Sequence, residues 1–388
     1  MKKVNTSKIS GTQELLPEEQ AIFNELKATV SSTYRKHGFF NIEAPTLERT
    51  DILLAKAGGD TEKQIYRVIK TTESADNVSE ALRFDHTVPL ARYIVEHESA
   101  LTFPFKVSNV GLNFRGERAQ KGRFREFYQC DVDVIGRGNL PIAYDADVIS
   151  TLLDTLSHFN LNTPILARIN NRKILTGLLE AFNLSDKAKD IYSIIDHAEK
   201  VPADRTLASF HEIGLSDADT AMLSDLINLA GDRETIINKL RALNINNAMF
   251  NTGLTELNEV LSLLEAQGLK NNISADLKIV RGLDYYTGTV FEFNLPAYKE
   301  VGSICGGGRY DNLTGYFSDQ SFPGVGGSIG LTRLFYVLNE NNLLESQGTP
   351  LLDYAIIPIS AAEFAYASTL GSRIRQDGHS VTIVYTDK

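Results

Sequence analysis

A long helical stretch separates two strand-rich parts of this chain, and that order limits the folds it can adopt. Between about residues 171 and 268 the apolar side chains recur at helical spacing, as in "ILTGLLEAF", "MLSDLINLA", "IINKLRAL" and "LNEVLSLLEAQGL". The flanking segments are strand-like: "KQIYRVI", "FKVSNVGLNFRG" and "RFREFYQCDVDVI" before it, "LKIVRGLDYYTGTVFEF" and "GVGGSIGLTRLFYVL" after it. We therefore predict an α+β fold, in which a mostly antiparallel sheet carries a helical insertion at about 171–268.

Both ends of the chain also carry clear signals. Residues 17–36 are predicted to be helical, because Pro17 suits the first turn, acidic residues follow it and Gly38 can end the helix. The tail "DYAIIPISAAEFAYASTLGSRIRQDGHSVTIVY" has the order strand, helix, strand, which is one βαβ unit. One such unit cannot cover both faces of a parallel sheet. We expect a main domain at 1–345, and at 351–388 the beginning of a small α/β domain that the sequence leaves incomplete.

Charge and cysteine content exclude several classes of protein. The chain has 388 residues and a formal net charge of -10, so a nucleic-acid or phosphate partner must meet a local basic patch. Its two cysteines, Cys130 and Cys305, show no metal-ligand spacing, which argues against a disulfide framework or a structural zinc site. The first residues lack the apolar core of a signal peptide, and no run approaches membrane-spanning length. We expect a cytoplasmic protein.

The segment "FRGERAQKGRFREFYQCDVDVIG", from Phe114 to Gly136, has its charges segregated. Its first half holds five cations between Arg115 and Arg125, and its second half carries the anions Asp131 and Asp133. In a strand from Arg123 onward, alternate residues share one face. These residues are Arg123, Arg125, Phe127, Gln129, Asp131 and Asp133. Such a face matches a ligand with a polyanionic end, a flat ring and a cationic end, which ATP and an amino acid supply together. A solvated hairpin with cross-strand salt bridges explains the charge pattern equally well.

Several motifs occur in an order that carries a family resemblance. "FRGERAQKGRFREF" resembles the second signature motif of class II aminoacyl-tRNA synthetases, and "GVGGSIGLTRL" resembles the third. "QCDVDVIG", "RGLDYYTGTVFEF", "CGGGRYDNL" and the loop "LRFDHTVPLARY" are similar to segments of the histidyl-tRNA synthetase family. The predicted helix with Pro45 lies where the first class II motif belongs. The likeness covers roughly residues 8–345, and implies a class II catalytic domain followed by the start of an anticodon-binding-like domain.

The resemblance implies an ATP site. Arg115 is expected to bind the α-phosphate as a bidentate, catalytic donor, which suits a guanidinium better than an ammonium. The same likeness implies that Glu117 binds the adenine amino group, Phe127 stacks on the ring, Arg123 contacts the terminal phosphate and Arg333 covers the other adenine face. Mg²⁺ is expected on the triphosphate, held mainly by phosphate oxygens and water, and no metal site is expected on the protein alone.

The resemblance also implies a histidine site. Carboxylates suit the ammonium of the substrate, Gln129 suits its carboxylate or main-chain groups, and tyrosines frame the imidazole. In the family, the arginine at the position of Arg281 lies beside the α-phosphate and takes a role filled elsewhere by a metal ion. We expect Arg281 to be catalytic on this ground. If Tyr285 and Tyr286 lie on a strand, they point to opposite faces. His86 is interpreted as a loop side chain beside the pocket. The expected histidine-binding residues are Asp85, Thr87, Arg115, Gln129, Asp133, Arg281, Tyr285, Tyr286 and Tyr310.

The function implied is that of a histidine–tRNA ligase, with ATP, L-histidine and the histidine tRNA as substrates, and with a homodimer formed around the first class II motif. One alternative is the regulatory subunit of ATP phosphoribosyltransferase, a non-enzymatic relative that binds histidine and lacks an anticodon-binding domain. The presence of Arg115, Arg123, Arg281 and Arg333 argues against it, because a histidine sensor needs no phosphate clamp. A second alternative, a nucleic-acid-binding module without catalysis, rests on the basic hairpin alone.

Overall fold

The computed structural model describes residues 4–55, 62–72, 78–118, 120, 122–159, 161, 163–280, 286–312, 314–344 and 351–385, with the backbone alone at residue 300. The chain divides into two compact units. One comprises Met1–Gln13 and Leu26–Leu343, and the other comprises Glu14–Glu25 and Leu344–Lys388. The predicted boundary between residues 345 and 351 lies outside the described residues and stays a prediction. No described helix is both long and apolar enough to cross a membrane.

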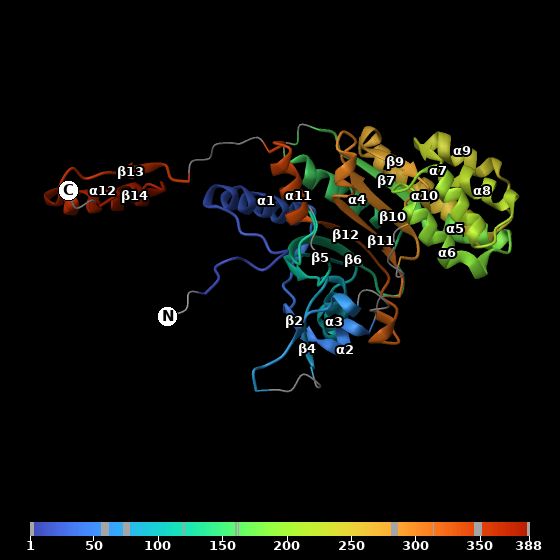
Figure 1. Cartoon of the computed structure of the whole chain (residues 1–388), viewed down its shortest axis with the longest axis horizontal. Coiled ribbons are helices and arrows are strands. Elements are labelled where there is room, and N and C mark those ends of the chain that lie inside the picture. The colour runs from blue at the N-terminus through green and yellow to red at the C-terminus, as the bar shows by residue number, and fades with distance from the viewer. Residues whose placement is uncertain are drawn as a thin grey trace. The chain divides into compact units, whose positions relative to one another are not determined.

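A nine-stranded sheet is the centre of the larger unit (Figure 1). Its neighbours are antiparallel except for the pairs β1–β5 and β7–β9. The mostly antiparallel sheet predicted from the sequence is therefore confirmed. In spatial order the strands are β1 (Phe40–Asn41), β5 (Phe105–Phe114), β6 (Glu126–Ile135), β12 (Gly324–Ile329), β11 (Cys305–Tyr310), β10 (Thr289–Asn294), β7 (Leu166–Asn171), β9 (Ile273–Asp276) and β8 (Ala230–Gly231).

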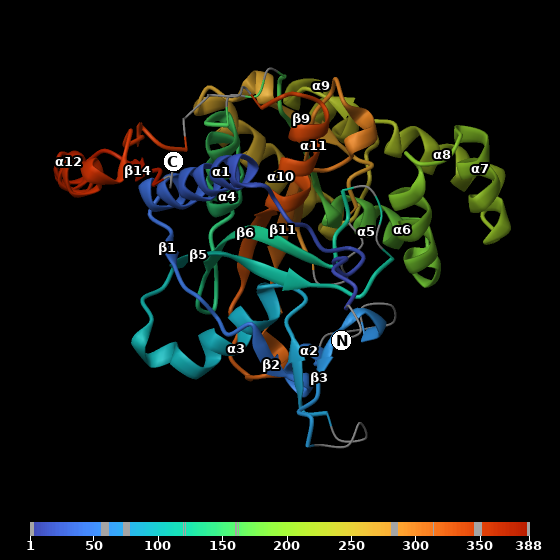
Figure 2. The ribbon, with the colours of Figure 1, turned by 60° about the vertical axis from the view of Figure 1, so that its left-hand side comes forward.

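The longest pairing joins β5 and β6, which lie side by side from Phe105↔Ile135 to Phe114↔Glu126 (Figure 2). Cys130, Val132 and Val134 of β6 are fully buried on one face. Helix α4 (Ala143–Ser157) packs on that face, and its apolar side chains are buried against the sheet. This burial fixes the register of β6, because a slip by one residue would turn its apolar side chains to the other face.

Helix α1 (Pro17–Lys36) agrees with the predicted range, and Gly38 follows it with φ of 80°. A positive φ favours glycine, so the predicted end of the helix has its physical reason. Near the C-terminal end of α1, Tyr34 is fully buried and its hydroxyl donates to the backbone carbonyl of Cys130 (2.8 Å).

The predicted insertion is helical, as the spacing of its apolar residues indicated. Four of its helices begin at side-chain caps, in which Asn171, Ser216, Asp232 and Asn247 accept from backbone N–H groups. Figures 1 and 2 show the helices α6, α7 and α8 standing away from the central sheet. The insertion helices are α5 (Arg172–Ala181), α6 (Ala188–His197), α7 (Ala203–Glu212), α8 (Asp217–Ile227), α9 (Arg233–Ala242) and α10 (Ala248–Ala266).

A smaller sheet and two helices flank the large sheet. The strands β2 (Leu47–Arg49), β4 (Glu80–Leu82) and β3 (Arg67–Val68) pair in that order, with α2 (Thr50–Leu54) and α3 (Thr87–His97) nearby in the chain. The strand predicted for "KQIYRVI" is wrong in extent, because only Arg67–Val68 pair and Glu62–Gln64 form a 3₁₀ turn. The strand-like interpretation of "LTRLFYVL" is also wrong: α11 (Leu331–Glu340) is a helix whose Leu331, Leu334 and Leu338 are buried together.

The smaller unit contains the predicted strand–helix–strand order. Strand β13 (Tyr354–Ile356) and strand β14 (Val381–Ile383) pair in parallel, and α12 (Phe364–Gln376) connects them. Gly378 follows the helix with φ of 88°. The βαβ unit is therefore confirmed within residues 351–385.

Candidate active site

The candidate site lies on the face of the large sheet opposite α4. Gly327 of β12 faces α4, because a Cβ built there would lie 2.6 Å from Leu152 Cδ1. Gly326 faces the other side, where a Cβ would lie 1.9 Å from Asp133 Oδ1. Since successive residues of a strand point to opposite faces, Phe127, Gln129, Asp131 and Asp133 share the face with Gly326. The predicted alternation of side chains along 127–133 is thereby confirmed.

Glycines clear this face for longer side chains. Asp133 occupies the space above Gly326, and Tyr286 lies over Gly308, where a Cβ would be 2.7 Å from its ring. The ring of Tyr310 covers Gly324 in the same way, at 2.4 Å. A side chain at any of these three positions would clash with Asp133, Tyr286 or Tyr310. Glycine is therefore needed where these side chains approach the backbone closely.

Burial raises the pKa of two carboxyl groups on this face. Tyr310 Oη donates to Asp133 Oδ1 (2.6 Å), and both residues are buried. Burial raises the pKa of Asp133 to about 8, although the Tyr310 hydrogen bond opposes this shift. Burial likewise raises the pKa of Asp85 to about 6, against the opposing effects of the Val88 backbone N–H, which donates to it (3.1 Å), and of Arg115. Elevated pKa values of buried carboxyl groups are typical of functional sites.

The middle of the face is a continuous hydrogen-bonded network that the sequence did not predict. Gln129 Nε2 donates to Ser328 Oγ (2.8 Å), and Ser328 Oγ donates to Asp131 Oδ1. Asp131 Oδ2 lies 3.1 Å from His86 Nδ1, and the amide of Asn113 lies 2.8 Å from Gln129 Oε1. Strand alternation predicts that Asp131 lies on this face, but the residues near it in the sequence do not indicate that Ser328 and His86 are its hydrogen-bond partners. His86, interpreted as a loop side chain, is buried against this network.

The basic end of the face holds the arginines. The Arg115 guanidinium carbon lies 5.1 Å from the centre of the Phe127 ring, and its Nε donates to the Phe84 carbonyl (3.0 Å). Arg123 Nη1 lies 3.5 Å from Glu117 Oε2, in a pair that is half-exposed. The contact with the Phe127 ring limits the orientations that the Arg115 guanidinium can adopt. The ring therefore helps to set the direction in which the terminal nitrogens of Arg115 point.

Arg333, at the start of α11, belongs to the same region. Its Nη2 donates to the Val301 carbonyl, and a Cβ built on Gly122 would lie 3.6 Å from its Cγ. Burial and the neighbouring Arg123 guanidinium lower the pKa of Arg333 below its usual value. Two guanidiniums held close enough to repel each other form a region suited to a polyanion.

The ligand face does not extend to Arg125, which corrects the prediction that β6 begins at Arg123. A bridge between Gln120 and Arg123 closes the turn, and β6 begins at Glu126. The side chain of Arg125 is used within the protein, where Nε donates to the Glu117 carbonyl (3.1 Å) and Nη1 to the Ser10 carbonyl (3.3 Å). Arg125 therefore anchors the N-terminal segment against the turn.

Of the other predicted site residues, the structure describes Thr87 and Tyr286. Thr87 is half-buried and is the first residue of α3, next to the Asp85 loop. Arg281 and Tyr285 lie outside the described residues, and Tyr286 is buried in the core beside Tyr310. Tyr286 does not belong to a described strand, so the prediction of opposite faces for the two tyrosines does not apply to it.

A buried ion pair underlies Tyr310 and was missed from the sequence. Arg309 Nη2 lies 2.7 Å from Asp145 Oδ1 and also donates to the Pro141 carbonyl, while Nε donates to Asp145 and Nη1 to the Leu140 carbonyl. Asp145 is fully buried, and burial raises its pKa despite the Arg309 charge. The pair joins α4 to β11 one residue before Tyr310. No local pattern could have indicated it, because its partners are 164 residues apart.

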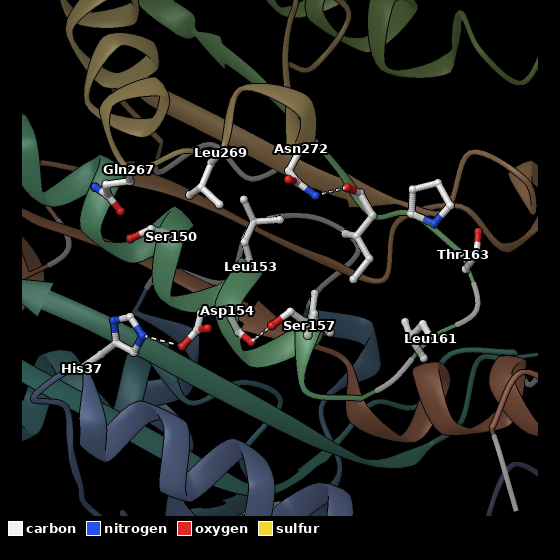
Figure 3. A pocket seen from close by; sticks show the side chains of 13 residues that line it. His37, Ser150, Leu153, Asp154, Ser157, Leu161, Thr163, Gln267, Leu269 and Asn272 are labelled. Carbon is white, nitrogen blue, oxygen red and sulfur yellow. Dashed lines mark hydrogen bonds and ion pairs between the residues drawn. The ribbon is translucent and has the colours of Figure 1, made fainter.

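A separate pocket of about 540 Å³ lies along α4 and contains none of the predicted site residues (Figure 3). His37 Nε2 lies 2.8 Å from Asp154 Oδ2 at its edge, and Leu153, Leu269 and Asn272 line it. Within the described part of the chain, no group of three or more His, Cys, Asp or Glu residues could hold a metal ion.

Comparisons with known proteins agree with the motifs. The family model for histidyl-tRNA synthetase matches residues 11–334. The chain is similar to a histidine–tRNA ligase of Clostridium tetani, with 43% identity over 380 residues, which cover 97% of this chain and 85% of that protein. Its fold is similar to the crystal structure of histidyl-tRNA synthetase from Nostoc sp. PCC 7120, with a TM-score of 0.89 and 35% identity, covering 100% of this chain and 87% of that one.

A third comparison bears on the fold alone. A structure from Bacillus halodurans C, described as an ATP phosphoribosyltransferase regulatory subunit/histidyl-tRNA synthetase, has a TM-score of 0.82 at 23% identity and covers 98% of this chain and 93% of that one. The description of that structure gives both a regulatory subunit and a synthetase, so the fold alone does not distinguish the ligase from the regulatory subunit.

Proposed function

Because this chain belongs to the histidyl-tRNA synthetase family, we propose that it is an ATP-dependent histidine–tRNA ligase with its active site on the polar face of β6. The observation that carries the proposal is the order of groups along that face. Arg115 stacks on Phe127 at one end, and Asp133 pairs with Tyr310 at the other. The six-residue step from Phe127 to Asp133 spans roughly 20 Å, which accommodates a nucleotide and an amino acid end to end.

The reaction has two steps. A carboxylate oxygen of histidine attacks the α-phosphorus of ATP, the bond from that phosphorus to the bridging oxygen breaks, and pyrophosphate leaves. A hydroxyl at the 3′ end of the tRNA then attacks the carbonyl carbon of the adenylate, and AMP leaves. Charge develops on phosphate oxygens in the first step, so fixed cations and the alignment of the two substrates supply the rate enhancement.

The arginine-rich end takes the nucleotide in this proposal. Arg115, oriented by Phe127 and by the Phe84 carbonyl, binds the α-phosphate, and Arg123 binds the terminal phosphate. Binding the triphosphate offsets the repulsion between Arg123 and Arg333, which adds to the effect of burial in lowering the pKa of Arg333. Glu117 accepts from the adenine amino group, while Phe127 and Arg333 enclose the ring. Family resemblance supports each of these roles.

The carboxyl-rich end takes histidine. The ammonium binds beside the Asp85 carboxylate, with Gln129 and Thr87 next to the main-chain groups of the substrate. A cation there lowers the pKa of Asp85 from about 6. Tyr286 and Tyr310 frame the imidazole together with Asp133, since Tyr310 already bonds to that carboxyl group. Arg281 and Tyr285 are assigned by the resemblance alone, with Arg281 beside the α-phosphate and Tyr285 beside the substrate ring.

Mg²⁺ enters this scheme with the substrate. The described residues contain no cluster of three metal-ligating side chains, and this donor set fits an ion held mainly by the phosphate oxygens and water of MgATP. The ion would neutralise charge on the β- and γ-phosphates. The protein's part is to orient the triphosphate with Arg115 and Arg123.

We further propose that the protein acts as a cytoplasmic homodimer with the histidine tRNA as its partner. Strand β1 is an edge strand of the large sheet, and its Phe40 is 68% exposed. Edge strands with exposed aromatic side chains are favourable sites for pairing with a second chain.

Histidine-dependent ATP–pyrophosphate exchange tests the proposal. We expect exchange with histidine and none with the other amino acids, and a parallel pull-down with an ATP phosphoribosyltransferase catalytic subunit should recover nothing. Absence of exchange together with capture of that subunit would support the regulatory alternative. Charging of the histidine tRNA, followed by acid precipitation of labelled histidine, tests the second step separately.

A further inference from the structure

We propose that Asp131, acting through Ser328, fixes the donor and acceptor orientation of the Gln129 side-chain amide and so positions it for bound histidine. The inference rests on the proposed function to the extent that Gln129 contacts histidine. Asp131 and Ser328 face each other across the β6–β12 pair, in the register Ser328↔Asp131, and both belong to the face opposite α4. Asp131 is thus a positioning residue that has no contact with the ligand itself.

The protons available in the network determine the direction of each of its hydrogen bonds. An ionised carboxylate is only an acceptor, so the single proton of Ser328 must point to Asp131 Oδ1. The Ser328 oxygen can then only accept from Gln129, which places Gln129 Nε2 toward Ser328 (2.8 Å). Gln129 Oε1 must consequently face Asn113 (2.8 Å). The charge on Asp131 therefore determines where the remaining N–H and the remaining oxygen lone pair of Gln129 point for a ligand.

The amides of Asn113 and Gln129 could also adopt the reversed orientation, so the charge on Asp131 selects between two arrangements of the network. If the amide of Asn113 is turned, its nitrogen donates to the carbonyls of Leu112 (3.2 Å) and Asp85 (3.3 Å), and its oxygen faces Gln129. Gln129 must then turn as well, and its oxygen meets Ser328. Ser328 would have to give its proton to Gln129, leaving Asp131 Oδ1 against a lone pair. Ionised Asp131 opposes this arrangement, because an unpaired buried carboxylate oxygen costs more than the contact of the neutral Asn113 oxygen with the Leu112 and Asp85 carbonyls in the first arrangement.

His86 holds Asp131 in place for this role. Its Nδ1 lies 3.1 Å from Asp131 Oδ2, and both side chains are buried. Since the carboxylate only accepts, Nδ1 must carry the proton. His86 and Ser328 thus occupy the two carboxylate oxygens from opposite sides, and the carboxylate has little freedom to rotate away from Ser328.

Three variants separate orientation from simple loss of a contact. Asp131→Asn keeps its oxygen toward His86 and turns its amide nitrogen toward Ser328, which favours the reversed arrangement of Gln129. Ser328→Ala removes the connection and leaves the amide without a preferred orientation. Ser328→Thr keeps a hydroxyl. Ser150→Ala on α4 is a matched control, because its hydroxyl bonds to the Asp147 carbonyl on the other side of the sheet.

Binding of histidine by titration calorimetry, without ATP, is the primary measurement. We expect the Kd for histidine to rise at least about tenfold in Asp131→Asn and by less in Ser328→Ala. It should stay within about threefold in Ser328→Thr and be unchanged in Ser150→Ala. The Kd for ATP should stay within about twofold in all four. The double variant Asp131→Asn/Ser328→Ala should bind histidine no worse than Ser328→Ala, because the asparagine can impose no orientation without the serine.

Multiplicative losses in the double variant, an equal loss of ATP affinity, or a Ser328→Thr protein as weak as Ser328→Ala would each overturn the proposal. Pyrophosphate exchange on the same proteins distinguishes this failure from failure of the proposed function. A wild-type protein that binds histidine but catalyses no exchange contradicts the ligase, while the pattern of Kd values still decides the role of Asp131. A wild-type protein that binds no histidine contradicts both.

Discussion

The hydroxyl of Tyr310 donates to Oδ1 of Asp133 at 2.6 Å, across the strands β11, β12 and β6. Gly324 and Gly326 of the intervening strand make this possible, because a Cβ on either would collide with one of the two side chains. The bond places an aromatic side chain beside a carboxyl group whose pKa is raised to about 8. The protonation of Asp133 therefore makes both the stability of the fold and ligand binding depend on pH.

Asp133 makes stability fall as pH rises. Its pKa is about 8 in the folded protein against an ordinary value of about 3.8, so the folded state binds an extra proton between these pH values. Asp85, with a pKa of about 6, acts in the same direction below pH 6. Between pH 6 and 8.5 we expect wild-type protein to lose about 2–3 kcal/mol of unfolding free energy that Asp133→Asn does not lose. Urea unfolding at the two pH values measures this.

The exposed variant Asp319→Asn is the control for this experiment and should follow the wild-type profile at both pH values. Parallel profiles for wild-type and Asp133→Asn protein would show that Asp133 is ionised in the folded state throughout this range, and the interpretation of its burial would be wrong.

Two adjacent glycines are expected to respond in opposite ways to the same substitution. A Cβ at Gly326 would lie 1.9 Å from Asp133 Oδ1, whereas a Cβ at Gly327 would meet Leu152 and Phe291 in the core. We expect Gly326→Ala to lower kcat/KM for histidine at least about tenfold, since Asp133 must move. Gly327→Ala should chiefly lower the melting temperature, as overpacking costs about 1–3 kcal/mol. Thermal unfolding and pyrophosphate exchange on both variants test this, and similar profiles for the two would contradict the assignment of faces.

Local periodicity was enough to predict the main elements. The helix at 17–36, the helical insertion and the shared face of Phe127, Gln129 and Asp133 all follow from spacing within about twenty residues. Errors arose where a local pattern admits two structures. "LTRLFYVL" is apolar enough for a strand, but its Leu331, Leu334 and Leu338 match a helical stripe as well, and the packing of α11 decides.

Pairings between distant residues could not be predicted from one sequence. The bond from Ser328 to Asp131 joins residues 197 positions apart, and His86 is 45 positions from Asp131. Nothing in the local sequence of Ser328 distinguishes it from a solvent-exposed serine. Its role depends on the register of β12 against β6, which is fixed by packing of the whole sheet. The family resemblance indicated the residues that we expect to bind the ligands, but it indicated no role for the residues that hydrogen-bond to them.

Arg281 carries the most specific prediction about catalysis. Its role beside the α-phosphate rests on the resemblance, and a fixed guanidinium there would stabilise charge without a proton transfer. We expect Arg281→Ala to lower kcat for pyrophosphate exchange by about 10²–10³ or more, with the melting temperature changed by less than about 2 °C. Arg49→Ala, at a side chain that is 70% exposed, is the control and should retain exchange. Near-normal exchange by Arg281→Ala would show that another group stabilises the phosphorus centre.

The buried pair of Arg309 and Asp145 gives a prediction about stability that does not depend on the ligand. Both side chains are at most 5% exposed, and Asp145 has Arg309 as its charged partner. Asp145→Asn should cost about 3–5 kcal/mol, because it leaves a buried guanidinium without its counter-charge. Asp145→Leu combined with Arg309→Met removes both charges and should recover part of this loss. Recovery is incomplete because Arg309 also donates to the carbonyls of Leu140 and Pro141, which the double variant leaves unbonded. Urea unfolding of the three proteins measures the differences, and a double variant less stable than Asp145→Asn would show that the carbonyl contacts outweigh the ion pair.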